Sequence, residues 1–236
     1  LISLKSIMSN LALIPARGGS KRIPRKNIKD FLGKPIIAYS IETALHSGLF
    51  DEVMVSTDDN EIAEVAKKFG AQVPFIRSAE NSTDLATTTD VIIEVLGNYK
   101  YILKKEFKFV CCIYPAAPLI EPQDLIAGYN LLCEEKFHSL FPVVSFSYPI
   151  WRGLERGVRG LTKMLWPENL NKRTQDLKKV FHDAGQWYWL DASMAHEGVF
   201  SNKTGTIIVS ELRVQDIDNL EDWKMAEMKY KMRHEA

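Results

Sequence analysis

The sequence predicts an α/β protein in which a mostly parallel sheet is covered by helices on both faces. Short apolar runs alternate with segments of helical spacing between Leu11 and Phe146, and polar or turn-rich residues follow the runs. Those residues form the segments Pro15–Lys26, Ser56–Asp59 and Tyr114–Pro118. Ligands of such sheets bind beyond the carboxyl ends of the strands, so the sequence also predicts where a binding site lies.

Each predicted strand is a short run rich in apolar side chains. The runs are Leu11–Ile14, Asp51–Ser56, Ala71–Phe75, Phe107–Tyr114, Leu140–Phe146, Gln186–Leu190 and Thr206–Val209. The first run is uninterrupted up to Pro15, which is typical of a parallel strand buried on both faces.

The predicted helices begin at residues suited to helix N-termini. The expected starts are Pro35, Asn60, the residues before Val91, Pro122 and Glu221, and the last helix runs to His234. Proline suits a first helical turn because its missing N–H would be unpaired there, and Asn60 can cap the second helix.

The length predicts a single domain that spans residues 8–236. Met8 is the expected natural start, so that residues 1–7 would be upstream additions. The alternation of strands and helices breaks down over residues 148–179, where Gly153, Gly157 and Gly160 interrupt a basic segment. We expect this segment to form a small lobe that protrudes from the domain.

Composition argues against several classes of protein. Thirty basic residues balance thirty acidic ones, so a nucleic acid held by the bulk field is not the expected partner. No apolar stretch reaches the roughly 18 residues of a membrane span, and Leu1–Asn10 lacks the centre of a signal peptide. Cys111, Cys112 and Cys133 form neither a metal set nor an even disulfide framework. We expect a cytoplasmic protein with reduced thiols.

The most informative motif is the loop that follows the first strand, Ile14–Asn27. It carries five basic residues between Arg17 and Lys26, and Gly18 and Gly19 let backbone N–H groups approach an anion. This combination predicts a triphosphate site. The spacing matches neither the ATPase phosphate loop nor the dinucleotide fingerprint, and the simpler alternative is a solvated basic turn.

A second motif, VQDID, places Asp216 and Asp218 two residues apart. On a strand such residues point to the same side, so their carboxylates can converge. Two carboxylates together with phosphate oxygens suit Mg²⁺, and we therefore expect Asp216 and Asp218 to bind magnesium. The alternative is a solvated turn.

The run IPARGGSKRIPRKN, followed by GKPIIAYSIETAL and VSTDD, resembles the CMP-sugar synthetases. These enzymes are the cytidylyltransferases of sialic, pseudaminic, legionaminic and 3-deoxy-octulosonic acids. The resemblance extends from Leu11 to about Tyr230, and the segments CCIYPAAP, RTQDL, FHDAGQWYW and VQDIDNLEDW look most like the pseudaminic acid branch. Tyr114 and the residues around His182 depart from the sialic acid branch.

The resemblance implies a three-layer α/β/α Rossmann-like nucleotidyltransferase fold, with the lobe at 148–179 as a dimerisation element of a homodimer. It implies an Mg²⁺-dependent enzyme that transfers CMP from CTP to the anomeric hydroxyl of a nine-carbon acidic sugar and releases pyrophosphate. Pseudaminic acid is the expected sugar. The alternatives are N-acetylneuraminic, legionaminic or 3-deoxy-octulosonic acid, and more remotely a non-catalytic nucleotide-binding regulator.

The resemblance also implies roles for individual residues. The expected nucleotide-binding residues are Arg17, Gly18, Gly19, Ser20, Lys21, Lys26, Arg77, Ala86 and Thr88. The expected catalytic residues are Arg17, Lys21 and the metal ligands Asp216 and Asp218. A plain surface position is the alternative for Arg77, and helix capping is the alternative for Thr87–Thr89.

The sugar is expected to contact Tyr114, Arg152, Arg173, His182, Asp183 and Gln186. Arg173 matches a family arginine that holds the sugar carboxylate, for which a guanidinium supplies two parallel bonds. Arg152 is the weaker second candidate, and a structural role is the alternative for His182. The aromatic run Trp187–Trp189 is expected to fill the core, and the general base stays open.

Overall fold

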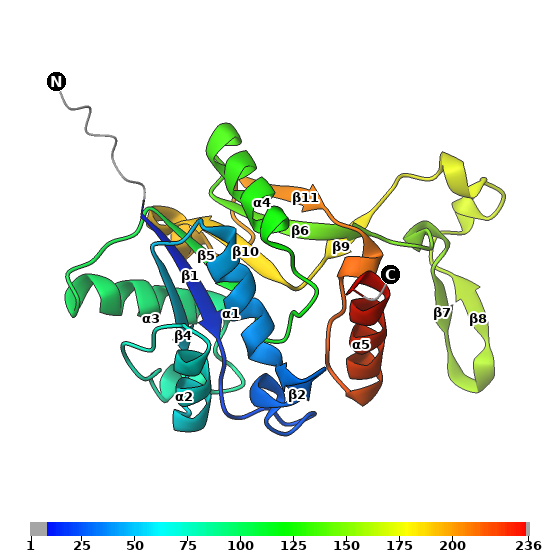
Figure 1. Ribbon diagram of the computed structural model, residues 1–236. Coiled ribbons are helices and arrows are strands. Elements are labelled where there is room, and N and C mark those ends of the chain that lie inside the picture. The colour runs from blue at the N-terminus through cyan, green and yellow to red at the C-terminus, as the bar shows by residue number, and fades with distance from the viewer. Residues whose placement is uncertain (1–8, 235–236) are drawn as a thin grey trace.

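The computed structural model describes residues 9–234 of the chain as three layers, with a central sheet between two layers of helices (Figure 1). Met8 and residues 1–7, which the sequence analysis treated as the start and its upstream additions, lie outside the described residues. Within this part of the chain, no helix is both long and apolar enough to span a membrane.

The sheet has seven strands in the order β11-β6-β10-β5-β1-β4, and β9 pairs with β6 at its carboxyl end. The strands are β1 (Asn10–Pro15), β4 (Glu52–Ser56), β5 (Phe109–Ile113), β6 (Ser139–Ser145), β9 (Phe181–Asp183), β10 (Trp187–Asp191) and β11 (Thr204–Ile208). β1, β4, β5, β6 and β11 point in one direction, whereas β9 and β10 run antiparallel to their neighbours. The prediction of a mostly parallel sheet is confirmed.

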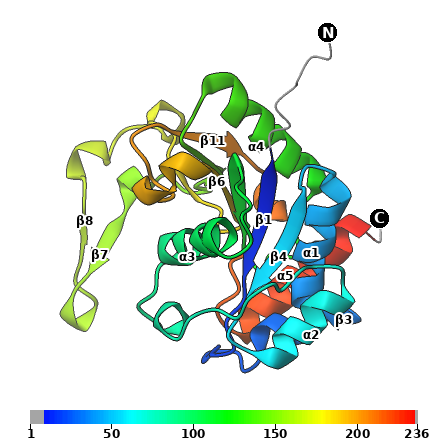
Figure 2. The ribbon, with the colours of Figure 1, turned by 90° about the vertical axis from the view of Figure 1, so that its left-hand side faces the viewer.

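Among residues 9–234, five α-helices pack around the sheet. They are α1 (Ile36–Ser47), α2 (Asn60–Lys68), α3 (Thr88–Tyr101), α4 (Pro122–Glu135) and α5 (Leu220–His234). α1, α2 and α4 pack on one face of the sheet around a core that includes Ile41, Ile62 and Leu125, and α3 covers the other face with Ile92 and Tyr99 (Figure 2). The three-layer prediction is therefore confirmed.

Helix α5 closes the layer beside α1 through an aromatic cluster. Trp223 and Tyr230 of α5 pack edge-on against Phe31, which precedes α1 in the small hairpin of β2 (Asp30–Phe31) and β3 (Lys34–Pro35). The segment that leads into α5 is thereby brought beside the loop that follows β1.

Three local expectations were wrong. Ala71–Phe75 is not a strand but makes a single bridge from Gln72 to Met54, because Pro74 cannot donate to a ladder. The cap of α2 is Asp59 rather than Asn60, and its carboxylate accepts hydrogen bonds from the N–H groups of Glu61 and Ile62, at 3.0 Å each.

The third expectation was the strand assumed for Asp216 and Asp218. These residues lie in an irregular segment between a 3-10 turn (Glu211–Arg213) and α5. Val214 and Ile217 are its buried apolar residues, and their spacing of three does not fit the alternation of a strand. The two carboxylates are placed by this buried anchor and not by strand geometry.

The segment at 148–179 forms the protruding lobe that the sequence predicted (Figure 1). Its core is an antiparallel pair, β7 (Leu154–Arg156) and β8 (Thr162–Met164), which stands away from the sheet. Trp151 packs edge-on against Trp166 at its base, with ring centroids 5.5 Å apart. The aromatic run also behaves as expected, since Trp187 and Trp189 are fully buried.

Candidate active site

A cleft of about 710 Å³ opens at the carboxyl ends of β1, β4 and β5. Its walls come from the loop after β1, from the segment between Arg77 and Thr88, and from Tyr114 after β5. Asp218 borders the cleft from the segment before α5. Two of the three predicted segments, Pro15–Lys26 and Tyr114–Pro118, thus contribute to the cleft, whereas no residue of Ser56–Asp59 lines it.

The loop after β1 is held in shape by polar contacts of its own backbone. Asn27 is buried, and its side chain donates to the carbonyl of Arg17 at 3.0 Å. The N–H of Gly18 donates to the carboxylate of Asp58 at 2.8 Å. A β-carbon at Gly18 would lie 2.7 Å from a carboxylate oxygen of Asp59, so close packing against the start of α2 requires glycine here.

The basic residues of this loop divide into two groups. Arg17, Lys21, Arg22 and Lys26 line the cleft. Arg25 instead pairs with Asp59 and Glu61 at the start of α2, and it adopts a left-handed backbone conformation with φ of 56°. Arg25 therefore anchors the loop and does not contribute to the cleft.

The other arginine of the nucleotide set, Arg77, is almost fully buried beneath the cleft, so the alternative of a plain surface arginine is wrong. Its Nε donates to the hydroxyl of Ser56 at 2.9 Å, and its terminal nitrogen donates to the carbonyl of the same residue. Burial lowers the pKa of the guanidinium, which nevertheless stays far above neutral pH. Arg77 thus supplies a fixed positive charge at the end of β4.

The threonines at the start of α3 perform two tasks. Thr87 caps the helix and forms a capping box with Asp90. Thr88 faces Tyr114, with 3.0 Å between the two hydroxyl oxygens. Ala86, Thr87 and Thr88 all line the cleft, so the positive end of the α3 dipole also points at this space.

Lys26 joins the basic loop to the acidic segment. Its ammonium group donates to the carbonyl of Ile217 at 2.7 Å, between Asp216 and Asp218. Burial lowers the pKa of Lys26, while the two carboxylates oppose that shift. Asp218 pairs with Arg22 at 2.7 Å, whereas Asp216 has no ion pair within residues 9–234.

Asp216 borders a second, smaller cavity of about 90 Å³, together with Lys26, Tyr114 and Gly185. Burial, and after it the charge of Asp218, raises the pKa of Asp216. A carboxylate that is exposed at the edge of a cavity and has no cationic partner is an available ligand for a divalent ion, so Asp216 fits the expected magnesium.

The expected sugar-binding residues are brought together only in part. Tyr114 borders both cavities. His182, Asp183 and Gln186 shape the turn between β9 and β10: Asp183 accepts from the hydroxyl of Tyr188 at 2.7 Å, and Gln186 donates to the carbonyl of Arg213 at 2.7 Å. His182 packs edge-on against Phe146 at 4.9 Å.

Arg152 and Arg173 lie in the lobe and line neither cavity. Arg152 donates to the carbonyl of Lys172 at 2.7 Å, and Arg173 pairs with Asp176 at 2.9 Å. Within one chain, these two residues do not join the rest of the site.

The chain is similar to known proteins along most of its length. The sequence model of the family described as "Cytidylyltransferase" matches residues 11–217. The chain belongs to the cytidylyltransferase family.

Members of this family are nucleotidyltransferases, and several relatives match along almost the whole chain. A "Pseudaminic acid cytidylyltransferase" of Campylobacter jejuni subsp. jejuni is 42% identical over 234 residues, which is 97% of this chain and 99% of the relative. A "CMP-N,N'-diacetyllegionaminic acid synthase" of Legionella pneumophila is 29% identical and covers 97% of this chain and 99% of its own length. The solved structure of a CMP:2-keto-3-deoxy-manno-octonic acid synthetase complexed with CTP matches with a TM-score of 0.69 at 20% sequence identity. The match covers 97% of this chain and 100% of that structure, and it supports the fold.

For a cytidylyltransferase, the arrangement offers positive charge from three directions. The loop after β1 supplies Arg17 and Lys21, the end of β4 supplies the buried Arg77, and the N-terminus of α3 faces the same space. Fixed charges of this kind stabilise negative charge that develops during phosphoryl transfer.

Sequence reasoning missed four residues of the site. Asn27 and Asp58 hold the loop after β1, and Arg22 and Asp84 line the cleft. Asn27 is the last residue of the motif that resembles the family, so its position in that motif could have predicted a role in the site. Asp84 carried no such signal, because its contacts with the loop span more than sixty positions of sequence.

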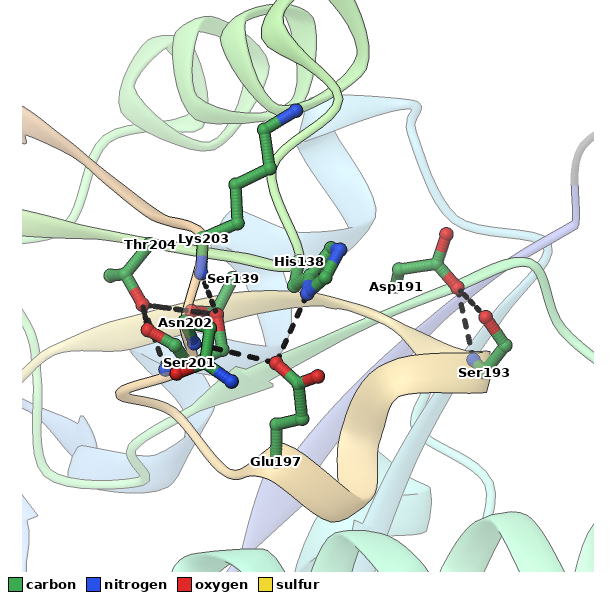
Figure 3. Close-up of polar contacts among 9 residues, drawn as sticks. All are labelled: His138, Ser139, Asp191, Ser193, Glu197, Ser201, Asn202, Lys203 and Thr204. Carbon is green, nitrogen blue, oxygen red and sulfur yellow. Dashed lines mark hydrogen bonds and ion pairs between the residues drawn. The ribbon is translucent and has the colours of Figure 1, made fainter.

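A second polar cluster lies at the opposite end of the sheet and has a structural role (Figure 3). The hydroxyl oxygens of Ser139, Ser201 and Thr204 lie 2.8 to 3.1 Å from one another, and His138 contacts Glu197 at 3.0 Å. These contacts fasten the turn before β11 to the start of β6.

Proposed function

We propose that this protein transfers CMP from CTP to the anomeric hydroxyl of pseudaminic acid and releases pyrophosphate. The observation that carries the proposal is that the basic loop and Asp218 border one cleft, while Lys26 lines both this cleft and the smaller cavity that Asp216 borders. The choice of sugar is supported by the pseudaminic acid cytidylyltransferase of Campylobacter jejuni subsp. jejuni, which is 42% identical to this chain and matches it along almost the whole length of both.

In the proposed reaction, the anomeric oxygen of the sugar attacks the α-phosphorus of CTP in line, and the bond to the bridging oxygen of pyrophosphate breaks. Arg17 and Lys21 hold the β- and γ-phosphates and neutralise the charge that builds on the leaving group. Thr88 and the N-terminus of α3 border the part of the cleft that faces the nucleoside. Most of the acceleration is assigned to positioning and charge neutralisation.

Asp216 and Asp218 would hold Mg²⁺. When bound, this ion would neutralise phosphate oxygens and orient them for the displacement. In the protein itself, Lys26 holds the acidic segment through the carbonyl of Ile217, and Arg22 keeps Asp218 at the border of the cleft.

The thiols of Cys111 and Cys112 are buried and form no disulfide. They support a reducing compartment, and we therefore propose that the protein is cytoplasmic.

The test is release of pyrophosphate from CTP and Mg²⁺ with each of four sugars: pseudaminic, N-acetylneuraminic, legionaminic and 3-deoxy-octulosonic acids. We expect turnover with pseudaminic acid at least about tenfold faster than with the others, since polar pocket contacts discriminate strongly. Faster turnover of another acid would reassign the substrate but keep the reaction. Binding of CTP without pyrophosphate release from any sugar would instead support a nucleotide-binding regulator.

We further propose that the protein is a homodimer in which the lobe of one protomer covers the cleft of the other. Leu154, Val158 and Leu161 of the lobe are 62%, 86% and 81% exposed, which is much apolar surface for a protrusion. Such an arrangement would give Arg152 and Arg173 access to a sugar, which they lack within their own chain.

Light scattering at micromolar concentration is expected to give twice the mass of 26.9 kDa. The double variant Val158→Asp and Leu161→Asp should be monomeric, because burial of two carboxylates in an apolar interface is unfavourable. A matched pair of changes at exposed apolar residues outside the lobe, Tyr101→Asp and Ile102→Asp, should leave the dimer intact. A monomeric wild-type protein would contradict the proposal.

A further inference from the structure

The cleft contains an acidic side chain that the reaction does not use. Asp84 lies in the segment between Arg77 and α3, and its carboxylate pairs with Arg17 at 2.8 Å and also with Lys21. These two cations are the residues assigned to the terminal phosphates of CTP. Asp84 therefore stands where a phosphate group of the substrate would be bound.

The segment that carries Asp84 is fixed at both ends. On one side, Glu94 of α3 accepts hydrogen bonds from the N–H and the hydroxyl of Ser78, both at 2.8 Å. On the other side, Thr87 and Asp90 form the capping box of α3. Between these points Leu85 is 90% exposed and adds no packing. Asn81 also donates to Glu94, but the ion pairs of Asp84 are the contacts that join this segment to the loop on the other side of the cleft.

The charges make these contacts exchangeable. The side chain of Asp84 is half-exposed, and Lys21 is largely exposed, so each ion pair is weak in water. Lys21 in the first place, and Arg17 after it, hold the pKa of Asp84 below its usual range, so the carboxylate is ionised at neutral pH. A triphosphate carries more negative charge than one carboxylate and would repel Asp84 from the same cations.

We propose that Asp84 is an internal competitor for the phosphate site: its carboxylate occupies Arg17 and Lys21 in the free enzyme, leaves when CTP binds, and returns when pyrophosphate departs. This inference rests on the proposed function, because it takes Arg17 and Lys21 as phosphate ligands. Its consequence is a lower affinity for both CTP and pyrophosphate than the cations alone would give. The return of Asp84 to Arg17 and Lys21 stabilises the empty site and so promotes the release of pyrophosphate.

The test is direct binding of inorganic pyrophosphate by calorimetry, followed by the KM for CTP. Asp84→Asn should bind pyrophosphate about tenfold more tightly than the wild type and should show a lower KM for CTP, because both competition and like-charge repulsion are removed. The gain should shrink as potassium chloride is raised from low to physiological ionic strength, because exposed charges are screened.

Glu80→Gln is the matched control. Glu80 is exposed on the same segment and forms no ion pair among the described residues, so the variant removes one negative charge without freeing Arg17 or Lys21. Its affinity for pyrophosphate should stay close to that of the wild type. An equal gain in Glu80→Gln would reduce the effect to bulk charge and overturn the proposal.

The outcomes separate this inference from the proposed function. Tight pyrophosphate binding by the wild type with unchanged or weaker binding by Asp84→Asn would keep the phosphate site and reject the competitor, since Asp84 would then only organise Arg17 and Lys21. No pyrophosphate binding by either protein would reject the phosphate site itself, and the competitor with it. A melting temperature for each variant establishes that the fold is retained.

Discussion

Replacement of Asp216 by asparagine is expected to lower kcat by about a thousandfold, the range seen when a major electrostatic contribution to a transition state is lost. Asp216 makes no ion pair within residues 9–234, and it borders the smaller cavity together with Tyr114 and Lys26. Asparagine keeps the size of the side chain but removes the negative charge that a divalent ion requires. The measurement is pyrophosphate release at saturating CTP over a range of Mg²⁺ concentrations.

Glu221→Gln is the matched control, since Glu221 is an exposed acid five positions further on. Its kcat and its Mg²⁺ dependence should equal those of the wild type. Full activity of Asp216→Asn would eliminate Asp216 as a metal ligand and leave Asp218 to be tested in the same way.

Thermal unfolding checks that Asp216→Asn does not act through stability. Burial raises the pKa of Asp216 in the folded protein above its ordinary value in the unfolded chain, so folding favours the protonated carboxyl group. The protonated group stabilises the folded state at pH values below the ordinary pKa. This stabilisation is lost as the pH rises through the raised pKa of the folded state. At neutral pH without metal, the neutral asparagine should therefore leave the melting temperature equal or higher. Mg²⁺ should raise the melting temperature of the wild type but not of the variant.

Replacement of Lys26 by methionine is expected to lower kcat/KM for CTP by about a hundredfold or more, because a partly buried charge is lost from both the phosphate site and the acidic segment. Lys26 lines both cavities, and its ammonium group holds the carbonyl of Ile217 at 2.7 Å. Methionine retains the apolar stem of the side chain. The effect should appear in KM for CTP and also as a weaker apparent affinity for Mg²⁺.

Lys29→Met provides the comparison for this variant. Lys29 is an exposed lysine in the same loop, and its ammonium group lies over the ring of Trp223, 5.6 Å from the centroid and outside the cleft. Its kinetic constants should change less than about twofold, as expected for a surface charge away from a site. If Lys26→Met and Lys29→Met were equally active, the link between the basic loop and the acidic segment would have no catalytic importance.

Sequence alone identified the layers because the periodicity of apolar residues reflects burial directly. The run Leu11–Ile14 became the centre of β1, and the helical spacing after Pro35 became α1. The basic loop could also be predicted, since its glycines and basic residues lie close together in the sequence. Local patterns of this kind report which residues are buried and which segment can approach an anion.

The strand direction of β10 and the position of Asp216 were decided by tertiary contacts. β10 lies antiparallel between β5 and β6, which no pattern within Trp187–Asp191 specifies. Asp216 borders the smaller cavity, and Val214 and Ile217 anchor the irregular segment that carries it beside helix α5. Pairing and register of distant segments depend on the whole packed domain.

The fold class, the basic loop and the family resemblance could be predicted from the sequence, because each is encoded in neighbouring residues. Which charges of the loop are available depends on contacts with distant parts of the chain. The tertiary structure turned Arg25 toward Asp59 and Glu61, and it brought Asp84 onto Arg17 from 67 positions away. Ion pairs form between residues that are close in space, and distance along the chain does not reveal them.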